Sequence, residues 1–425
     1  MTELLVAALA VFGYGMVSKN VLPAVITPAM VFTSVGLILG GGVLGVFDPG
    51  LTVTSTEVII EATLVLVLFS DAVRIDLRVL RTHAGPPLRL LGGALPLTVV
   101  AGTGVGMWLL DLPIWNAMLL AAILAPTDAA LGSAVVTDQR LPATVRQTVN
   151  VESGLNDGIA LPLVTVLVGV VASEVDDEST SEVARFVAEQ IGFGVAAGLI
   201  AGGLGGWALA RSVRSDHVSG VFRQLSTLAV PVVAYAAAVL LGGNGFIAAF
   251  VGGMAFGRAI PGAVEHVVDF TEDYAELLTA ATFLVFAAGT AGPLLDALDW
   301  RVALYVVASL TVVRIVPTLI ALAGSGLLME TRLFLGWFGP RGLASILFML
   351  TVVEDLSAAA AQPLLVAISW TVLVSVYAHG LSAAPWAARL SRKIAEHSAA
   401  EVAMAESTEV PELPTRRRPT SAVDA

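Results

Sequence analysis

Thirteen apolar segments of helical length follow one another along the chain and decide what it can fold into. A helix needs about 20 mostly apolar residues to cross a bilayer. Only 13% of the residues are charged, whereas globular proteins carry about 25%. The segments are also too long for an outer-membrane barrel, whose strands show about 10 alternating residues. We therefore predict an all-α polytopic membrane protein of about 13 transmembrane helices. The segments are 3–18, 24–46, 57–73, 88–110, 114–137, 148–172, 184–210, 224–241, 245–257, 275–292, 302–324, 334–353 and 361–388.

Basic residues lie mostly in every second connection between the predicted helices, that is, in connections of one parity, which share one side of the membrane. This distribution orients the helices. Cytoplasmic loops of membrane proteins carry an excess of Lys and Arg. The other parity holds Arg185 and Arg301 beside acids such as Glu174, Asp176 and Glu182. The distribution predicts an N-terminus outside and a cytoplasmic C-terminus. Bases of the first parity are Lys19, Arg74, Arg78, Arg81, Arg89, Arg140, Arg146, Arg211, Arg214, Arg223, Arg258, Arg332, Arg389, Arg392, Lys393, Arg416, Arg417 and Arg418.

The two ends of the chain differ in character. Segment 3–18 follows an acidic start and shows no small-residue cleavage site, so we expect a retained helix rather than a signal peptide. Residues 393–425 lack apolar periodicity and are rich in Ala, Glu, Ser, Pro and Arg, which predicts a disordered cytoplasmic tail.

Composition excludes several kinds of site. With 0 cysteines the chain has no thiol nucleophile, disulfide or cysteine-bound metal. Its 5 histidines show no zinc-site spacing. No GxxxxGKS/T loop is present, so an ATP-driven pump is not expected. The net charge of -12 disfavours binding to nucleic acid. We expect no cofactor, nucleotide or nucleic-acid partner.

Polar side chains cluster inside the sixth segment, 148–172. Charged groups at mid-bilayer cost about 2.5–3.5 kcal/mol on insertion scales, so each needs a partner or a function. Helical spacing places Glu152 and Asn156 on one face, and Ser153 with Asp157 on the adjacent face. Glu152 could alternatively be solvated near the start of the helix. Asp157 lies too deep in the segment for that explanation.

The fifth and twelfth segments each contain a helix breaker beside a charge. The fifth contains Pro126 and Asp128, and the twelfth contains Gly339, Pro340 and Arg341. Proline frees carbonyl groups, which are tolerated at bilayer depth only where they face protein or a watery cavity. Both segments are therefore predicted to be broken helices.

These two breaks are equivalent if the chain contains two repeats, about 1–172 and 224–388, joined by a linker helix at about 184–210. An offset of seven segments reverses the direction of crossing, so the repeats are inverted. Paired broken helices that cross at mid-membrane mark the binding site of secondary transporters and disfavour a channel.

The cluster has the chemistry of a site for a hard cation. Carboxylate and hydroxyl oxygens suit Na⁺ and offer nothing soft enough for copper or zinc. Arg314 and Arg341, inside the apolar segments, can neutralise two carboxylates and leave at least one acid for a cation or a proton. A remote alternative is an intramembrane aspartyl protease that uses Asp128 and Asp157 as its pair.

Several motifs together resemble the monovalent cation:proton antiporters of the NhaP and NHE type. The resemblance implies an antiporter domain over 1–392, with thirteen helices in inverted repeats. It also implies a core that moves like an elevator against a dimerising domain, and a homodimer. The motifs are APTD at 125–128, LPATVR at 141–146, VESGLNDG at 151–158, GPRG at 339–342 with Ser345, and His379 and Gly380 with Pro385.

The resemblance assigns the cation and proton site. Asp157 matches the essential cation- and proton-binding aspartate, and Ser153 matches a neighbouring ligand. Thr127, through its carbonyl, and Asp128 match the contribution of the broken helix. Na⁺ would then lie at Asp157, Ser153 and Thr127.

Other matched positions concern charge. Asn156, which the resemblance also places in the cation- and proton-binding site, matches the asparagine that accompanies electroneutral exchange in the family. Glu152 matches an acid that pairs with an arginine, for which Arg314 is the first candidate and Arg341 the second. Glu61 lies where relatives place a further acidic ligand or gate, although it could also be an acid near the outer end of its helix.

We therefore expect an electroneutral exchanger of Na⁺ or Li⁺ for H⁺, with a K⁺/H⁺ antiporter on the same fold as the alternative. Ala129 follows the Thr-Asp pair where many relatives have proline, which leaves the cation preference open. The preference for Arg over Lys is typical of a GC-rich bacterial genome, so we expect a multi-pass protein of the plasma membrane, the bacterial inner membrane.

Overall fold

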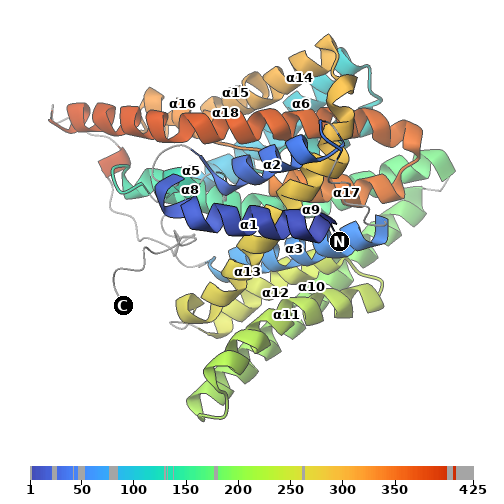
Figure 1. The fold of residues 1–425 in the computed structure, drawn as a ribbon, viewed down its shortest axis with the longest axis vertical. Helices are drawn as coiled ribbons and strands as arrows, with labels where there is room; N and C mark the ends of the chain where they lie inside the picture. Colours follow the sequence, from blue (N-terminus) through green and yellow to red (C-terminus); the bar gives the residue numbers. More distant parts are fainter. Residues whose placement is uncertain are drawn as a thin grey trace.

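The fold is all-helical in the part of the chain that the structure describes (Figure 1). The structure is a computed structural model, and it describes residues 2–21, 26–41, 43–45, 53–75, 85–128, 131, 133–136, 138–176, 180–260, 264–399 and 405–407. Each predicted apolar segment overlaps at least one helix in these ranges, which confirms the predicted fold class. Ala129, Arg78 and Arg81 lie outside the described residues.

The first repeat of the prediction contains helices α1 to α9. They are α1 (Thr2–Val21), α2 (Pro28–Leu39), α3 (Val53–Val73), α5 (Gly85–Arg89), the π-helical turn η1 (Leu90–Ala94), α6 (Leu95–Leu110), α7 (Ile114–Ile123), α8 (Ser133–Val136) and α9 (Ala143–Asp176). The predicted linker is α10 (Thr180–Arg214).

The second half contains α11 to α18. They are α11 (Gly220–Leu240), α12 (Gly245–Ala259), α13 (Val264–Val285), the π-helical turn η2 (Phe286–Ala291), the 3₁₀ turn η3 (Gly292–Ala297), α14 (Trp300–Leu310), α15 (Val312–Ala321), α16 (Met329–Trp337), α17 (Leu343–Asp355) and α18 (Ala358–Ala399). A last 3₁₀ turn, η4, spans Ala405–Ser407.

The helices pack into two lobes. The first lobe contains α3, α10, α11, α12 and α13, which pack mainly on one another. The second contains α6, α7, α14, α15, α16 and α18. Figure 1 shows α11 at one end of the molecule and α14 and α15 at the opposite end. Helix α9 contacts α7 of the second lobe and α3 and α12 of the first, so it lies where the lobes meet.

Much of the outer surface is apolar. Trp207, Leu240 and Phe222 expose 59%, 85% and 66% of their surface, and a water-soluble protein rarely exposes large contiguous apolar patches. Within the described residues, seven helical stretches are long and apolar enough to cross a membrane, and four shorter apolar helices accompany them. The protein is a multi-pass membrane protein; the count of thirteen crossings and their orientation stay predictions.

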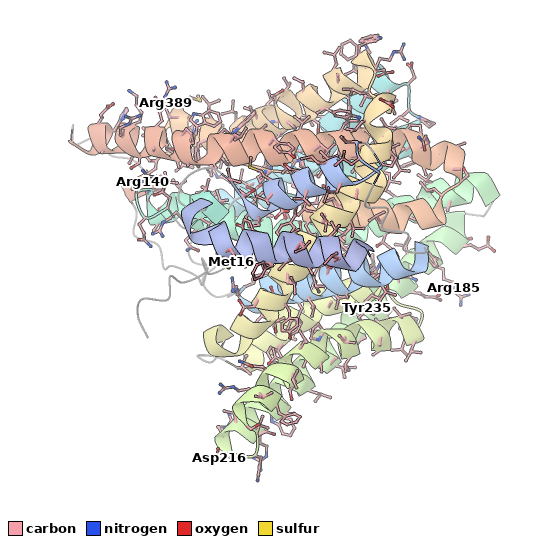
Figure 2. The ribbon with its side chains drawn as sticks, viewed as in Figure 1. Met16, Arg140, Arg185, Asp216, Tyr235 and Arg389 are labelled. Atoms are coloured by element: carbon pink, nitrogen blue, oxygen red, sulfur yellow. The ribbon has the colours of Figure 1, made fainter. Side chains whose placement is uncertain are left out.

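Basic residues of the two predicted sides lie at opposite ends of the helix bundle. Arg140 and Arg389 lie at the same end of the bundle, and Arg185 lies at the opposite end (Figure 2). Ser391 donates a hydrogen bond to the carbonyl of Arg140 at 2.8 Å, which joins the end of α18 to the start of α9. We call these the Arg140 end and the Arg185 end; the predicted cytoplasmic side is the Arg140 end.

The prediction of a disordered tail from residue 393 is wrong for the first residues of that tail. Helix α18 continues to Ala399 because Ile394 is buried in an apolar cluster and Lys393 pairs with Glu396 one turn later. Further on, Glu406 is buried and accepts a hydrogen bond from the backbone N–H of Leu328 at 2.9 Å. Residues 408–425 lie outside the described part of the chain.

Candidate functional site

The two predicted helix breaks lie against each other. Helix α7 ends at Ile123, because Pro126 lacks an N–H and disfavours helical backbone at the residue before it. Helix α16 ends at Trp337, just before Gly339 and Pro340. The backbone N–H of Asp128 donates to the carbonyl of Pro340 at 2.8 Å. This hydrogen bond joins the two interrupted backbones directly, and we call the region the crossover.

The carboxylate of Asp128 caps the helix on the other side of the crossover. Its Oδ2 accepts a hydrogen bond from the N–H of Leu343, the first residue of α17, at 2.7 Å. Gly342, the residue before α17, has no side chain to provide this cap, and a Cβ there would overlap Asp128. A carboxylate at a helix N-terminus is stabilised by the unsatisfied N–H groups and by the helix dipole. Asp128 therefore holds α17 in place.

Arg341 binds the carbonyl groups at the end of α7, as Asp128 binds the N–H group at the start of α17. Its Nη1 donates to the carbonyls of Ala125 and Pro126 at 2.9 and 3.0 Å. Ser345 donates to the carbonyl of Ile123 at 2.9 Å. The carbonyl groups freed by the break thus face polar side chains of the twelfth segment, as the sequence required of carbonyls at bilayer depth.

Arg314, rather than Arg341, lies against Glu152. Nη2 of Arg314 donates to Oε1 of Glu152, and both side chains are buried. Gly339 makes room for this pair, because a Cβ at that position would lie 2.5 Å from Nε of Arg314. The ion pair therefore joins α9 and α15 and packs directly under the break between α16 and α17.

Asp157 lies on α9 beside a group of neutral oxygen-bearing side chains. The amide nitrogen of Asn156 donates to the Thr127 hydroxyl at 2.6 Å, and that hydroxyl lies 3.2 Å from the Ser153 hydroxyl. Ser153 and Asp157 are one helical turn apart on one face. All four residues are at least 92% buried, since Asp157 exposes 8%, Ser153 3% and the other two 1%. The structure thus brings together four of the residues that the resemblance matches to the ion site.

Glu61 is separate from this group in the hydrogen-bond pattern. It lies on α3, in the other lobe, and is half-buried. Helix α3 packs against α9, so Glu61 belongs to the lobe that faces the site rather than to the crossover itself.

The charges of the crossover do not balance. Its buried carboxylates and guanidinium groups, among the described residues, are three acids (Asp128, Glu152 and Asp157) and two arginines (Arg314 and Arg341). With all of them ionised, the sum is one negative charge, which one proton or one monovalent cation neutralises. The described residues contain no cluster of three or more His, Asp or Glu side chains able to hold a metal ion. The oxygens beside Asp157 are instead mostly neutral.

Ser375 was not predicted from the sequence as part of the site. Its hydroxyl accepts a hydrogen bond from the backbone N–H of Arg341 at 2.6 Å and lies 3.0 Å from Nδ1 of His379. In the sequence, Ser375 and His379 are two polar residues four positions apart in an otherwise apolar helix. This spacing does not indicate that they contact the crossover.

Comparison with known proteins gives a family match over nearly the whole chain. The family model described as "Sodium/hydrogen exchanger, transmembrane" matches residues 6–389. The structure of the sodium proton antiporter MjNhaP1 from Methanocaldococcus jannaschii at pH 8 superposes with a TM-score of 0.73 at 20% identity, covering 92% of this chain and 96% of that one. At this identity the likeness shows the fold.

Curated relatives match over part of their length. The K⁺/H⁺ antiporter NhaP of Alkalimonas amylolytica is 28% identical over 327 residues, which are 76% of this chain and 55% of that protein. The K⁺/H⁺ antiporter NhaP2 of Shewanella baltica (strain OS223) is 26% identical over 233 residues, 54% of this chain and 39% of that protein. The uncharacterized Na⁺/H⁺ exchanger YjcE of Escherichia coli (strain K12) is 26% identical over 267 residues, 60% of this chain and 46% of that protein. The matched region thus spans about half the length of these relatives or less.

Proposed function

The chain belongs to the sodium/hydrogen exchanger family of cation/proton antiporters, and from that membership we propose that it exchanges Na⁺ or Li⁺ for H⁺ at Asp157. A member of this family is a transporter and not an enzyme, so the alternative of an intramembrane aspartyl protease is wrong. Asp128, the second acid of that alternative, caps α17.

One observation carries the proposal: a buried carboxylate lies next to neutral oxygens at the crossing of two broken helices. The hydroxyls of Thr127 and Ser153 lie 3.2 Å apart, and Asp157 is one turn from Ser153 on the same face. Oxygen ligands with a single negative charge suit a dehydrated hard monovalent cation. A proton on Asp157 removes that charge, so cation and proton compete for one group.

The buried charges support one-for-one exchange. Asp128 and Glu152 are engaged with α17 and with Arg314, and both contacts are structural. Either one proton or one monovalent cation brings the crossover to neutrality, so the two loaded states carry the same charge. Asn156 supports this stoichiometry, because it donates an amide hydrogen bond to Thr127 where an aspartate would add a second titrating acid.

Alternating access would follow from motion between the two lobes. The resemblance implies that a core containing α9 moves like an elevator against a dimerising domain in a homodimer, and we include both in the proposal. The contacts support this division, because α9 contacts α3, α10 and α12 across the boundary. Transport of a mid-membrane charge by such motion requires no cofactor.

A K⁺/H⁺ antiporter is the second candidate. The observation that favours it is the naming of relatives from Alkalimonas amylolytica and Shewanella baltica as K⁺/H⁺ antiporters. The distinction between cations depends on the number and spacing of the oxygen ligands around Asp157, and the same assay separates the two candidates.

The test is cation-driven proton movement in everted vesicles or proteoliposomes, with Na⁺, Li⁺ and K⁺ compared across pH. We expect exchange with Na⁺ and Li⁺ in the wild type and none in Asp157→Asn. Glu189→Gln, an exposed acid of α10, is the matched control and should exchange normally. Retained exchange in Asp157→Asn would refute the role of Asp157, and exchange with K⁺ alone would favour the second candidate.

Electroneutrality has a separate measurement. The initial rate of exchange is recorded at several imposed membrane potentials with the cation and pH gradients held constant. A rate that is independent of the potential supports one-for-one exchange, and a rate that rises with potential would contradict the role given to Asn156.

A further inference from the structure

Phe250 packs against the backbone of α9 at the residue that follows Asp157. Gly158 has no side chain, and a Cβ at that position would overlap three atoms of the Phe250 ring. Phe250 is itself buried, with 7% of its surface exposed. Glycine at a helix surface permits this close approach of a ring to the backbone. The tip of the ring therefore occupies the space that the side chain of any other amino acid at position 158 would fill.

One turn earlier, the same face of α9 is open. Gly154 and Gly158 are four residues apart, so they face the same direction on the helix. Among the described residues, and apart from the adjacent backbone of α9 itself, no atom lies within 4 Å of a Cβ built on Gly154, whereas the Phe250 ring fills that place at Gly158. Helix α9 begins at Ala143, just after Arg140, so Gly154 comes before Gly158 on the way from the Arg140 end to the Arg185 end. The face thus changes from open to closed at the level of Asp157.

The ring also crosses the boundary between the lobes. Phe250 belongs to α12, which packs mainly on α3, α10 and α11, whereas α9 carries Asp157 and the ion pair to Arg314. A contact between a ring on one lobe and a bare backbone on the other can separate without breaking a hydrogen bond. Apolar constrictions of this kind block water and ions until the ring moves away.

We propose that Phe250 and Gly158 form the apolar seal that closes the path between Asp157 and the Arg185 end. The proposal rests on the exchange function proposed above and adds a positioning residue to it. The seal keeps protons and cations from reaching Asp157 from both sides at once, and motion of α9 past α12 opens it in the other half of the cycle.

The first test removes the ring. Phe250→Ala is reconstituted in proteoliposomes, and proton leak is measured from an imposed pH gradient in the absence of any transported cation. We expect the leak to rise several-fold over the wild type. Phe246→Ala is the matched control, because Phe246 lies one turn away on α12 and its ring packs against the ring of Tyr235. An unchanged leak in Phe250→Ala, or an equal leak in Phe246→Ala, would overturn the proposal.

The second test fills the glycine. In Gly158→Ala the added methyl takes the place of the ring, so the seal cannot close. We expect a higher leak and a lower maximal rate of exchange, with the half-saturating cation concentration unchanged. Gly154→Ala adds the same methyl to open space and should behave as the wild type. In the double variant Gly158→Ala/Phe250→Leu, the smaller leucine makes room for the added methyl. This variant should restore both the maximal rate of exchange and the low proton leak.

These readouts separate the seal from ordinary packing. A packing defect alone would lower the melting temperature while leaving the leak at the wild-type value, which would overturn the proposal. If Gly158→Ala does not fold, the Phe250 and Phe246 variants still decide. The leak assay uses only a proton gradient, so failure of the wild type to exchange cations would refute the proposed function separately from the seal.

Discussion

Glu152 and Arg314 form an ion pair whose side chains are 4% and 1% exposed, and it joins α9 to α15 at the level of the crossover. Two buried charges are expensive to desolvate, and their mutual attraction offsets this only while both are present. The pair therefore makes the position of α9 depend on the position of α15.

Removing one partner should destabilise the fold far more than removing both. Glu152→Leu or Arg314→Met alone leaves an uncompensated buried charge, which costs about 3–5 kcal/mol. The double variant should recover much of that loss. Unfolding free energies in detergent, combined in a double-mutant cycle, measure the coupling. As a control, Arg185→Ala breaks an exposed pair with Glu189 and should have no measurable effect. Additive single effects would contradict the pairing.

Asp128 and Asp157 should respond in opposite ways to neutralisation. Asp128 caps α17, so Asp128→Ala should lower the unfolding free energy by about 0.5–2 kcal/mol, as expected for a lost N-cap. Asp128→Asn keeps one acceptor oxygen and should retain exchange. Asp157→Asn should abolish exchange without loss of stability. Vesicle transport and thermal unfolding, measured on the same three variants, check the contrast; loss of exchange in Asp128→Asn with stability intact would instead make Asp128 a ligand.

Arg341 should matter through the carbonyls of α7. Arg341→Met removes hydrogen bonds to Ala125 and Pro126 and should cost about 1.5–3 kcal/mol for a charged donor. Ser345→Ala removes one neutral bond to Ile123 and should cost about 1 kcal/mol. Denaturant unfolding measures both losses of unfolding free energy, and the loss should be larger for Arg341→Met than for Ser345→Ala. Equal stability of Arg341→Met and the wild type would show that water satisfies these carbonyls equally well.

Glu406 should protect the start of α16. Its carboxylate accepts from the N–H of Leu328, and the adjacent Ala405 N–H donates to Gly326 at 3.2 Å. Truncation after Ala399 removes both bonds, so backbone amide exchange near Leu328 should become faster. Hydrogen–deuterium exchange with mass spectrometry compares the truncated chain, Glu406→Gln and the wild type, with α12 as an internal reference. Unchanged protection near Leu328 would contradict the contact.

The periodic apolar segments and the helix breakers were enough to predict most of the fold. Each of the thirteen segments overlaps a helix, and both predicted breaks are present, because length, hydropathy and proline act locally. The tail was mispredicted because Ile394 and Glu406 are ordered by contacts with distant residues. The composition of the tail does not indicate such contacts.

The sequence by itself determined which residues could carry the chemistry. Asp157, Ser153 and Asn156 share one stretch of helix, so spacing alone brings them together. Only the tertiary structure decided how the other charges are used. It paired Glu152 with Arg314, turned Arg341 toward the end of α7, set Asp128 at the start of α17, and placed Phe250 on Gly158. These contacts join residues distant in the chain, and their partners are chosen by packing and by the need to satisfy every buried polar group.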